Sequence, residues 1–415
     1  MSQENILQQV ITYNRSNLAL LLNSYAFIST SNKKFQRFND DIPKNLGDTV
    51  SFDLPPRFTT TNSLVAAFQS AVQRVQNLTV NQQASTAYEF TANQFIFNVK
   101  NYMEVFGKSA IAELGTQIEQ NVADLAETNT YRFFGDGVTP ISTFLQLANA
   151  LAFFRDYGAA KTDTKGYLPL ISVPSIVNSG LNQFTPEKNN REVMSWELGE
   201  FSQCKWYQSN LLPLHIAGTE GNNGSILTVA STVTNSEGGV IQITFNGTLN
   251  ANDPNSIKAY DKFVFNDGVT GQPNLRYLTF IGHFPSSSPV QFRSTANATS
   301  SGTNQVTVNI FPALQAPAGK DQNINNPIVP GMQVTVLPNH RCGLITAGDP
   351  LYLAMPKLPE EVPYPTSVAQ DPDSGASLRQ YYGSLFGQNQ RGMVHDCIWG
   401  STLVDEYSMM LAFPV

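Results

Sequence analysis

The fold of this chain is decided by residues 75–127, which read VQNLTVNQQASTAYEFTANQFIFNVKNYMEVFGKSAIAELGTQIEQNVADLAE. In the second half of this stretch, apolar residues recur every three or four positions, at Ile111, Leu114, Ile118, Val122 and Leu125. This spacing gives one apolar stripe along a helix, which we predict over residues 104–131. At about 1.5 Å per residue such a helix is roughly 40 Å long, which is the length of a spine through a domain. In the first half, AYEFT and FIFNV alternate apolar and polar residues and predict strands.

The sequence before this stretch predicts two protruding segments. Residues 1–45 are expected to form an N-terminal arm, because apolar residues keep a rough helical spacing there, at Ile6, Val10, Tyr13 and Leu21. Residues 46–80 are expected to form an extended loop region. In its segment TVSFDLPP, alternating residues predict a strand that stops at Pro55-Pro56, because proline cannot pair in a sheet. A short helix is predicted at 63–75.

A second helix is predicted after the spine. Thr139 is its expected N-cap, Pro140 lies in its first turn and Gly158 ends it. Its apolar face consists of Phe144, Leu147, Leu151 and Phe154. The segment YLPLISVPSIV then predicts a buried strand interrupted by proline. We assign residues 81–222, including the spine, to one core domain.

The pattern changes from helical to alternating at about residue 223. Residues 223–340 hold only five basic and five acidic residues, and six runs in them alternate: ILTVASTV, VIQITF, KFVF, RYLTFIGHF, QVTVNIF and MQVTVL. Six short strands separated by Gly, Asn, Asp and Pro predict an antiparallel β-barrel. The core domain resumes at 341–415 with the polar loop PTSVAQDPDSGAS and two last strands, MVHDCIWGS and EYSMMLAF. The barrel is therefore predicted to be inserted into the core.

Composition limits the class of protein. Charged residues make up 14% of the 415, and the net charge is −7. Soluble domains average about 25% charged residues, and the cores of protein interfaces are depleted in charge, so we expect a surface largely covered by neighbouring subunits. No apolar run reaches the length of a membrane span, and the start MSQENILQQV predicts no secretory signal. Three scattered cysteines predict a reducing compartment.

No set of residues has the spacing of a catalytic or cofactor site. The four histidines fit no triad signature, and no phosphate-binding glycine loop is present. The remaining candidates for a metal site are two His-x-Cys pairs: His340, Cys342, His395 and Cys397. Residues two apart share one face of a strand, so two neighbouring strands could bring these four groups around zinc. Because the spacing matches no standard zinc motif, we predict no metal, no cofactor and no catalytic residue.

Residues 75–127 resemble the major capsid (coat) proteins of tailed double-stranded DNA bacteriophages. In that family a strand of the L-T-V-x-x-Q type is followed by an alternating strand and a long spine helix that closes on an acidic turn like VADL. The resemblance implies the α+β fold of the Hong Kong 97 type, with a spine helix, an extended loop and an N-arm. The block 223–340 resembles the inserted domain of the short-tailed-phage coat-protein subgroup.

The resemblance also implies a function. The chain would be a structural protein and not an enzyme, and its pentamers and hexamers would self-assemble into an icosahedral phage head, first as a procapsid and then as a mature capsid. The implied partners are other copies, a scaffolding protein and a portal protein, without a membrane. The implied location is the virion, after assembly in the bacterial host cytoplasm. Because the chain is net negative, we expect it to hold the packaged double-stranded DNA genome by enclosure only.

Two alternatives stay open. A shell protein of the same fold could enclose cargo enzymes in a protein nanocompartment, and the Asn/Thr-rich middle of the chain could belong to an adhesin-like β protein. The inserted barrel favours the phage head over the nanocompartment. The helical first half disfavours the adhesin.

Overall fold

The computed structural model describes most of the chain, namely residues 14–33, 48–60, 68, 73–158, 163–180, 199–279, 282–302, 304–360, 364–372, 374–384 and 390–415. The chain divides into two compact units. Unit 1 comprises Met1–Asp53, Val75–Ala123 and Asp349–Leu403, and unit 2 comprises Leu54–Arg74, Asp124–Gly348 and Val404–Val415. No helix among the described residues is long and apolar enough to span a membrane.

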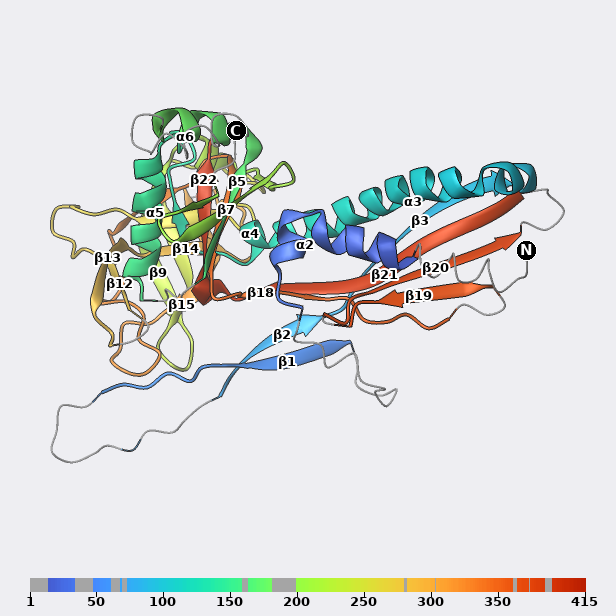
Figure 1. The fold of residues 1–415 in the computed structure, drawn as a ribbon. Helices are drawn as coiled ribbons and strands as arrows, with labels where there is room; N and C mark the ends of the chain where they lie inside the picture. Colours follow the sequence, from blue (N-terminus) through green and yellow to red (C-terminus); the bar gives the residue numbers. More distant parts are fainter. Residues whose placement is uncertain are drawn as a thin grey trace. The chain divides into compact units, whose positions relative to one another are not determined.

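Unit 1 is built on an antiparallel sheet of five strands. Their order is β18 (Leu351–Ala354), β21 (Gln390–Leu403), β20 (Ser377–Ser384) and β19 (Thr366–Gln370), and β3 (Gln82–Thr91) also pairs with β21. Helix α3 (Ala92–Ala123) follows β3 directly and lies along β3 and β21 (Figure 1). A separate two-stranded sheet joins β1 (Thr49–Leu54) to β2 (Arg74–Thr79). Part of the predicted polar loop is therefore strand, in β19 and the start of β20.

The predicted spine helix is present, but both of its ends differ from the prediction. Helix α3 begins at Ala92, so FIFNV is helical and its prediction as a strand was wrong. Short apolar runs do not distinguish a strand from a buried helix, which explains the error. The helix breaks at Asp124, and a short helix α4 (Leu125–Thr128) follows. The first four residues of the predicted stripe, from Ile111 to Val122, are buried, whereas Leu125 lies beyond the break and is only half-buried.

The second predicted helix is α5 (Phe144–Asp156), and its N-cap is Thr143 instead of Thr139. The Thr143 hydroxyl accepts a hydrogen bond from the backbone of Gln146, whose side chain accepts one from Thr143 in return. This reciprocal capping box stabilises the helix start better than a lone threonine does. The apolar face is buried as predicted, at Phe144, Leu147, Leu151 and Phe154, and Gly158 follows the helix with φ +80°.

Unit 2 contains a mixed sheet of seven strands packed against α5 and α6 (Val173–Gly180). Six strands run in the order β4 (Phe133–Phe134), β22 (Ser408–Phe413), β17 (His340–Ala347), β5 (Thr164–Pro169), β7 (Cys204–Ser209) and β6 (Glu200–Phe201), and β8 (Leu214–His215) pairs with β17. The strand predicted over 167–177 ends at Pro169 and continues as the turn η1 (Leu170–Ser172) and α6, because the prolines end the pairing.

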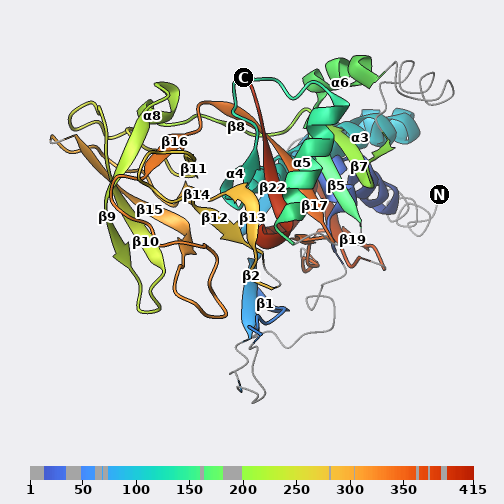
Figure 2. The same cartoon turned by 90° about the vertical axis from the view of Figure 1, so that its left-hand side faces the viewer.

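Unit 2 also contains the predicted six-stranded antiparallel barrel (Figure 2). Around the barrel the strands are β10 (Val240–Asn246), β15 (Gln305–Leu314), β14 (Gln291–Ser294), β11 (Lys262–Phe265), β16 (Gln333–Val336) and β9 (Ile226–Thr234). Five of these six were predicted, but RYLTFIGHF was wrong. That segment gives β12 (Arg276–Leu278), which pairs with β13 (Pro285–Pro289) outside the barrel. The sixth barrel strand is the short β14, whose sequence QFRS has no alternating pattern.

The interior of the barrel is aromatic. The rings of Phe263 and Phe292 stack with centroids 4.9 Å apart and planes at 1°. Two buried residues from outside 223–340, Tyr131 and Tyr157, belong to the same cluster. The side-chain amide of Gln291 also donates to the backbone carbonyl of Phe133 and accepts from its backbone N–H, at 2.8 and 2.9 Å. The barrel is thereby fastened to strand β4.

Several predictions fall outside the described residues. Of the N-terminal arm, Ile6, Val10 and Tyr13 lie outside them, while residues 14–23 are helical and Leu21 is buried. Most of the helix predicted at 63–75 also lies outside them, and its last two positions belong to β2.

Candidate functional site

The four candidate zinc ligands are divided between two sheets. His340 and Cys342 lie on β17, which pairs with β22, β5 and β8, while His395 and Cys397 lie on β21, which pairs with β18, β20 and β3. The two strands do not pair with each other, whereas the zinc hypothesis required neighbouring strands. Among the described residues, no group of three or more His, Cys, Asp or Glu is placed to hold a metal ion.

Burial keeps these four side chains neutral. It lowers the pKa of His340 to about 3 and that of His395 to about 4. It raises the pKa of Cys342 to about 12, and the pKa of Cys397 is raised as well. Both cysteines are buried in the core, where a neutral thiol packs as a small apolar group.

The first candidate site is the base of the extended loop, where two arginines bind one glutamate. Nη1 of Arg74 donates to Oε2 of Glu406 at 3.0 Å, and the Nη2 groups of Arg74 and Arg57 both donate to Oε1. The Glu406 side chain is 6% exposed, against 20% for Arg57 and 28% for Arg74. We call these three residues the loop clamp.

The sequence places both arginines where the loop leaves its strands. Arg57 follows Pro55-Pro56, which end the pairing of β1, and Arg74 is the first residue of β2. Farther along the two strands, the hydroxyls of Thr49 and Thr79 hydrogen-bond at 3.0 Å. The loop clamp thus holds the two ends of the segment Leu54–Arg74 within unit 2.

The loop clamp adjoins a second carboxyl group, that of the half-buried Asp405. Glu406 lies in the helical turn η2 (Asp405–Tyr407), next to Asp405. Burial, followed by the charge of Glu406, raises the pKa of Asp405 to about 6. Burial opposes the charge of Arg74, but its hydrogen bond and attraction to Glu406 raise its pKa. Both arginines hydrogen-bond to Glu406, and the charge of Arg74 offsets the raised pKa of Asp405 only in part.

The second candidate site is the seat of the N-terminal segment on helix α3. Glu119 of α3 is 1% exposed and accepts hydrogen bonds from the backbone N–H groups of Phe27 and Ile28, at 2.8 and 2.9 Å. These N–H groups open helix α2 (Ala26–Thr30), so the carboxylate caps a helix start. Burial raises the pKa of Glu119, and the two N–H groups act in the opposite direction.

Tyr25 completes this seat. Its hydroxyl donates to the carbonyl of Ala112 at 2.5 Å, and its ring covers Gly115 of α3. A Cβ atom on Gly115 would lie 2.3 Å from the ring, so only glycine lets the segment approach this closely. The N-terminal segment is thus fitted to α3 by both polar contacts and shape.

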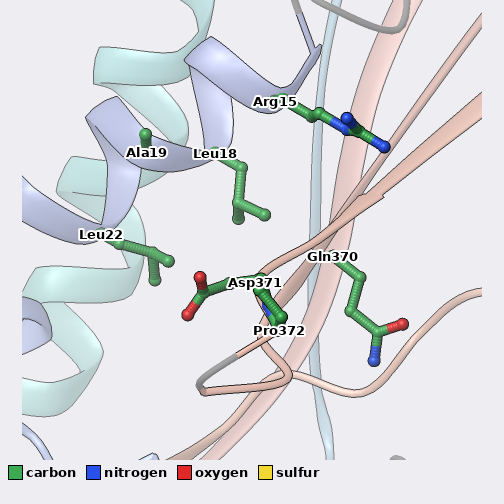
Figure 3. Close-up of a pocket in the computed structure, with 7 residues that line it drawn as sticks. All are labelled: Arg15, Leu18, Ala19, Leu22, Gln370, Asp371 and Pro372. Atoms are coloured by element: carbon green, nitrogen blue, oxygen red, sulfur yellow. The ribbon is translucent and has the colours of Figure 1, made fainter.

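A half-open hollow of about 440 Å³ lies in unit 1 between helical residues 14–23 and the end of β19. Its lining residues are Arg15, Leu18, Ala19, Leu22, Gln370, Asp371 and Pro372 (Figure 3). Four of the seven side chains are apolar, and the charged ones are Arg15 and Asp371.

Sequence reasoning located the loop and the arm but missed the residues that hold them. Glu119 directly follows Ile118 of the apolar stripe. An acidic residue beside that stripe was the one feature of the sequence that could have indicated the role of Glu119. In the loop clamp, Glu406 lies 332 positions along the chain from Arg74 and 349 positions from Arg57. No local pattern marks either arginine.

Comparison with solved structures gives similar chains at low sequence identity. The chain is similar to one of Mycobacterium phage Che8, with 8% identity over 88% of this chain and 84% of that chain and a TM-score of 0.43. It is also similar to the capsid structure of the cyanophage P-SCSP1u (10% identity, 88% and 83% covered, TM-score 0.41) and to the capsid of Ralstonia phage GP4 (7% identity, 89% and 84% covered, TM-score 0.43). No protein-family model and no curated protein matches the sequence. Because these TM-scores are low, the function proposed below rests on the chain's own residues.

Proposed function

We propose that this chain is a major capsid protein, whose copies self-assemble into the icosahedral head of a tailed bacteriophage. The loop clamp carries this proposal. It holds the two ends of the loop that joins β1 to β2, whose sheet is separate from both main sheets, and large apolar side chains on this loop and on β2 are exposed. Phe58, Phe68 and Val75 are 54%, 100% and 52% exposed. Apolar side chains held out on a fixed support are typical of a surface that another molecule covers.

The resemblance of residues 75–127 to phage capsid proteins supports a further copy of the chain as that other molecule. Contacts of this kind join one surface patch to a different patch on the next copy, and they close into rings when the rotation allows it. The low charged fraction, 14%, agrees with a surface that neighbouring copies cover. The seat of the N-terminal segment on α3 gives the arm a defined point from which to extend.

The finer assignments belong to the same proposal. We assign the fold to the Hong Kong 97 type, with residues 1–45 as the N-arm and 46–80 as the extended loop. Residues 81–222 and 341–415 form the capsid core, and residues 223–340 form the inserted barrel. Assembly proceeds through a procapsid with scaffolding and portal proteins, and the head encloses double-stranded DNA without binding it tightly. The protein has a structural and not an enzymatic role.

Electron microscopy of the full-length protein tests the proposal. Protein purified after expression with and without its scaffolding partner is imaged in negative stain, and its mass is followed by analytical ultracentrifugation. Closed shells or rings are expected with at least one of the two preparations. A monomer in both preparations, across micromolar concentrations, would refute the capsid proposal. Shells that contain host enzymes would favour the nanocompartment, whereas empty shells or shells that contain nucleic acid would favour the phage head.

A further inference from the structure

A buried histidine in unit 2 lies between two carboxylates. Nδ1 of His215 is 2.7 Å from Oε1 of Glu127, and Nε2 of His215 is 2.8 Å from Oδ1 of Asp261. His215 is 2% exposed and Asp261 is fully buried. Glu127 belongs to helix α4, whereas Asp261 directly precedes barrel strand β11. The imidazole therefore joins the barrel to the helix that continues the spine.

The three groups are held in place by the backbone around them. His215 lies on β8, opposite His340 of β17. The carboxylate of Asp261 accepts hydrogen bonds from the backbone N–H groups of Gly218 and Lys258, at 3.1 and 2.7 Å. Asp261 cannot move far without losing these contacts, and each carboxylate lies within hydrogen-bond distance of one ring nitrogen of His215.

A second barrel residue reaches the same helix. The Nζ of Lys262, next to Asp261, donates to the backbone carbonyls of Glu127 and Thr130. These carbonyls lie in and just beyond the last turn of α4, where backbone oxygens lack helical partners. Lys262 thus contacts the C-terminal end of α4 directly, whereas the adjacent Asp261 is linked to α4 through the ring of His215.

The bridge requires a charged imidazole. Each carboxylate oxygen accepts hydrogen bonds only, and a neutral imidazole carries a single N–H. Both contacts are satisfied only when both ring nitrogens carry hydrogen, which is the imidazolium form. We infer that the proton on His215 holds the barrel to helix α4, so that the attachment of the barrel depends on pH.

The electrostatics of the surroundings agree with this inference. Burial opposes the charge of His215, but its hydrogen bonds to Asp261 and Glu127 raise its pKa above the usual 6.5. The other titratable or charged groups that interact within this cluster are Asp124, Lys262, Arg293, His340 and Cys342. The ring of His340 is 5.1 Å from that of His215, and burial keeps it neutral, so it does not compete for the proton.

The sign of the effect follows from the raised pKa. The folded state binds the His215 proton more tightly than the unfolded chain does, so the stabilisation is complete below pH 6.5 and is lost as the pH rises through the folded pKa. Lys262 acts in the opposite direction, because burial lowers its pKa to about 7 and its neutral form is less costly to bury. A variant of His215 alone separates the two contributions.

The test uses the full-length protein and two measurements. NMR of protein labelled with ¹³C at histidine gives the pKa of His215, which is assigned by its loss in His215→Gln. Hydrogen exchange of residues 212–218 and 258–265 at pH 6.5 and 9, corrected for the intrinsic exchange rate, gives the opening of the barrel base. We expect a His215 pKa above 6.5. The opening should rise by up to tenfold per pH unit between pH 6.5 and that pKa and should level off above it.

Two variants serve as controls. His283→Gln changes a half-buried histidine outside the barrel strands and should keep the pH dependence of the wild type. Glu127→Gln removes one carboxylate and should lower the pKa of His215, which tests the inference even where His215→Gln does not fold. A His215 pKa at or below 6.5, or the same pH-dependent opening in wild type and His215→Gln, would overturn the inference. Neither result bears on whether the chain forms shells, which microscopy decides separately.

Discussion

Replacing Glu406 with glutamine should release the base of the extended loop. This variant keeps the size of the side chain but removes the charge that binds Arg57 and Arg74. Breaking a fully buried ion pair costs about 3–5 kcal/mol, whereas an exposed pair is worth about 0–1 kcal/mol. With Glu406 6% exposed and the arginines 20% and 28% exposed, we expect an intermediate loss of about 2–3 kcal/mol.

Hydrogen exchange measured by mass spectrometry resolves this loss locally. A loss of 2–3 kcal/mol corresponds to roughly 30- to 140-fold more frequent opening, and it should appear in residues 74–79 and 404–413. The matched control is Glu237→Gln, which changes an exposed glutamate in the turn between β9 and β10 and should leave these residues unaffected. An increase of less than about threefold in both segments would refute the conclusion that the charge of Glu406 fixes the loop.

Three further predictions concern other parts of the molecule. Gly115→Ala should displace the Tyr25 ring, lower the free energy of unfolding by about 1–3 kcal/mol and make residues 14–33 accessible to protease. Gly107→Ala is the control and should have none of these effects, because its added Cβ makes only ordinary contacts. Asp405→Asn should stabilise the protein by about 2–3 kcal/mol above pH 6, because burial raises the pKa of this acid from 3.8 to about 6. Urea unfolding measures this gain in stability, which should vanish as the pH falls below 3.8. The isolated fragment 223–340 should melt cooperatively but at a lower temperature than the barrel in the full chain, because it lacks the rings of Tyr131 and Tyr157, each of which contributes about 3–5 kcal/mol to its core. Calorimetry of fragment and full chain measures the difference, and a non-cooperative fragment would contradict this prediction.

The sequence could predict the elements whose pattern reflects burial on one side. The stripe from Ile111 to Val122 is visible because α3 packs against a sheet, and the alternating residues of β9, β10 and β15 are visible because one face of each strand lines the barrel. Strand β14 has four residues, three of them polar, so it carries no period from which to predict it. Its place in the barrel comes from its pairing with β11 and β15.

The candidate sites could not be predicted in the same way. The loop clamp and the His215 bridge consist of charged residues from distant parts of the chain, and their importance comes from burial and from their partners. The zinc hypothesis failed for a related reason. Its two His-x-Cys pairs have the right local spacing, but only the sheet order shows that β17 and β21 are not neighbours.

The two hydrogen bonds between Gln291 and Phe133 have a consequence for solubility. Strand β4 is the last strand at one side of its sheet, where free backbone groups could pair with a strand from another molecule and start aggregation. The Gln291 amide occupies both the N–H and the carbonyl of Phe133, as a neighbouring strand would. The barrel thereby covers the edge strand β4 while the chain is still a free subunit. A shortened chain without the barrel would have to supply a new cover for Phe133 to stay in solution.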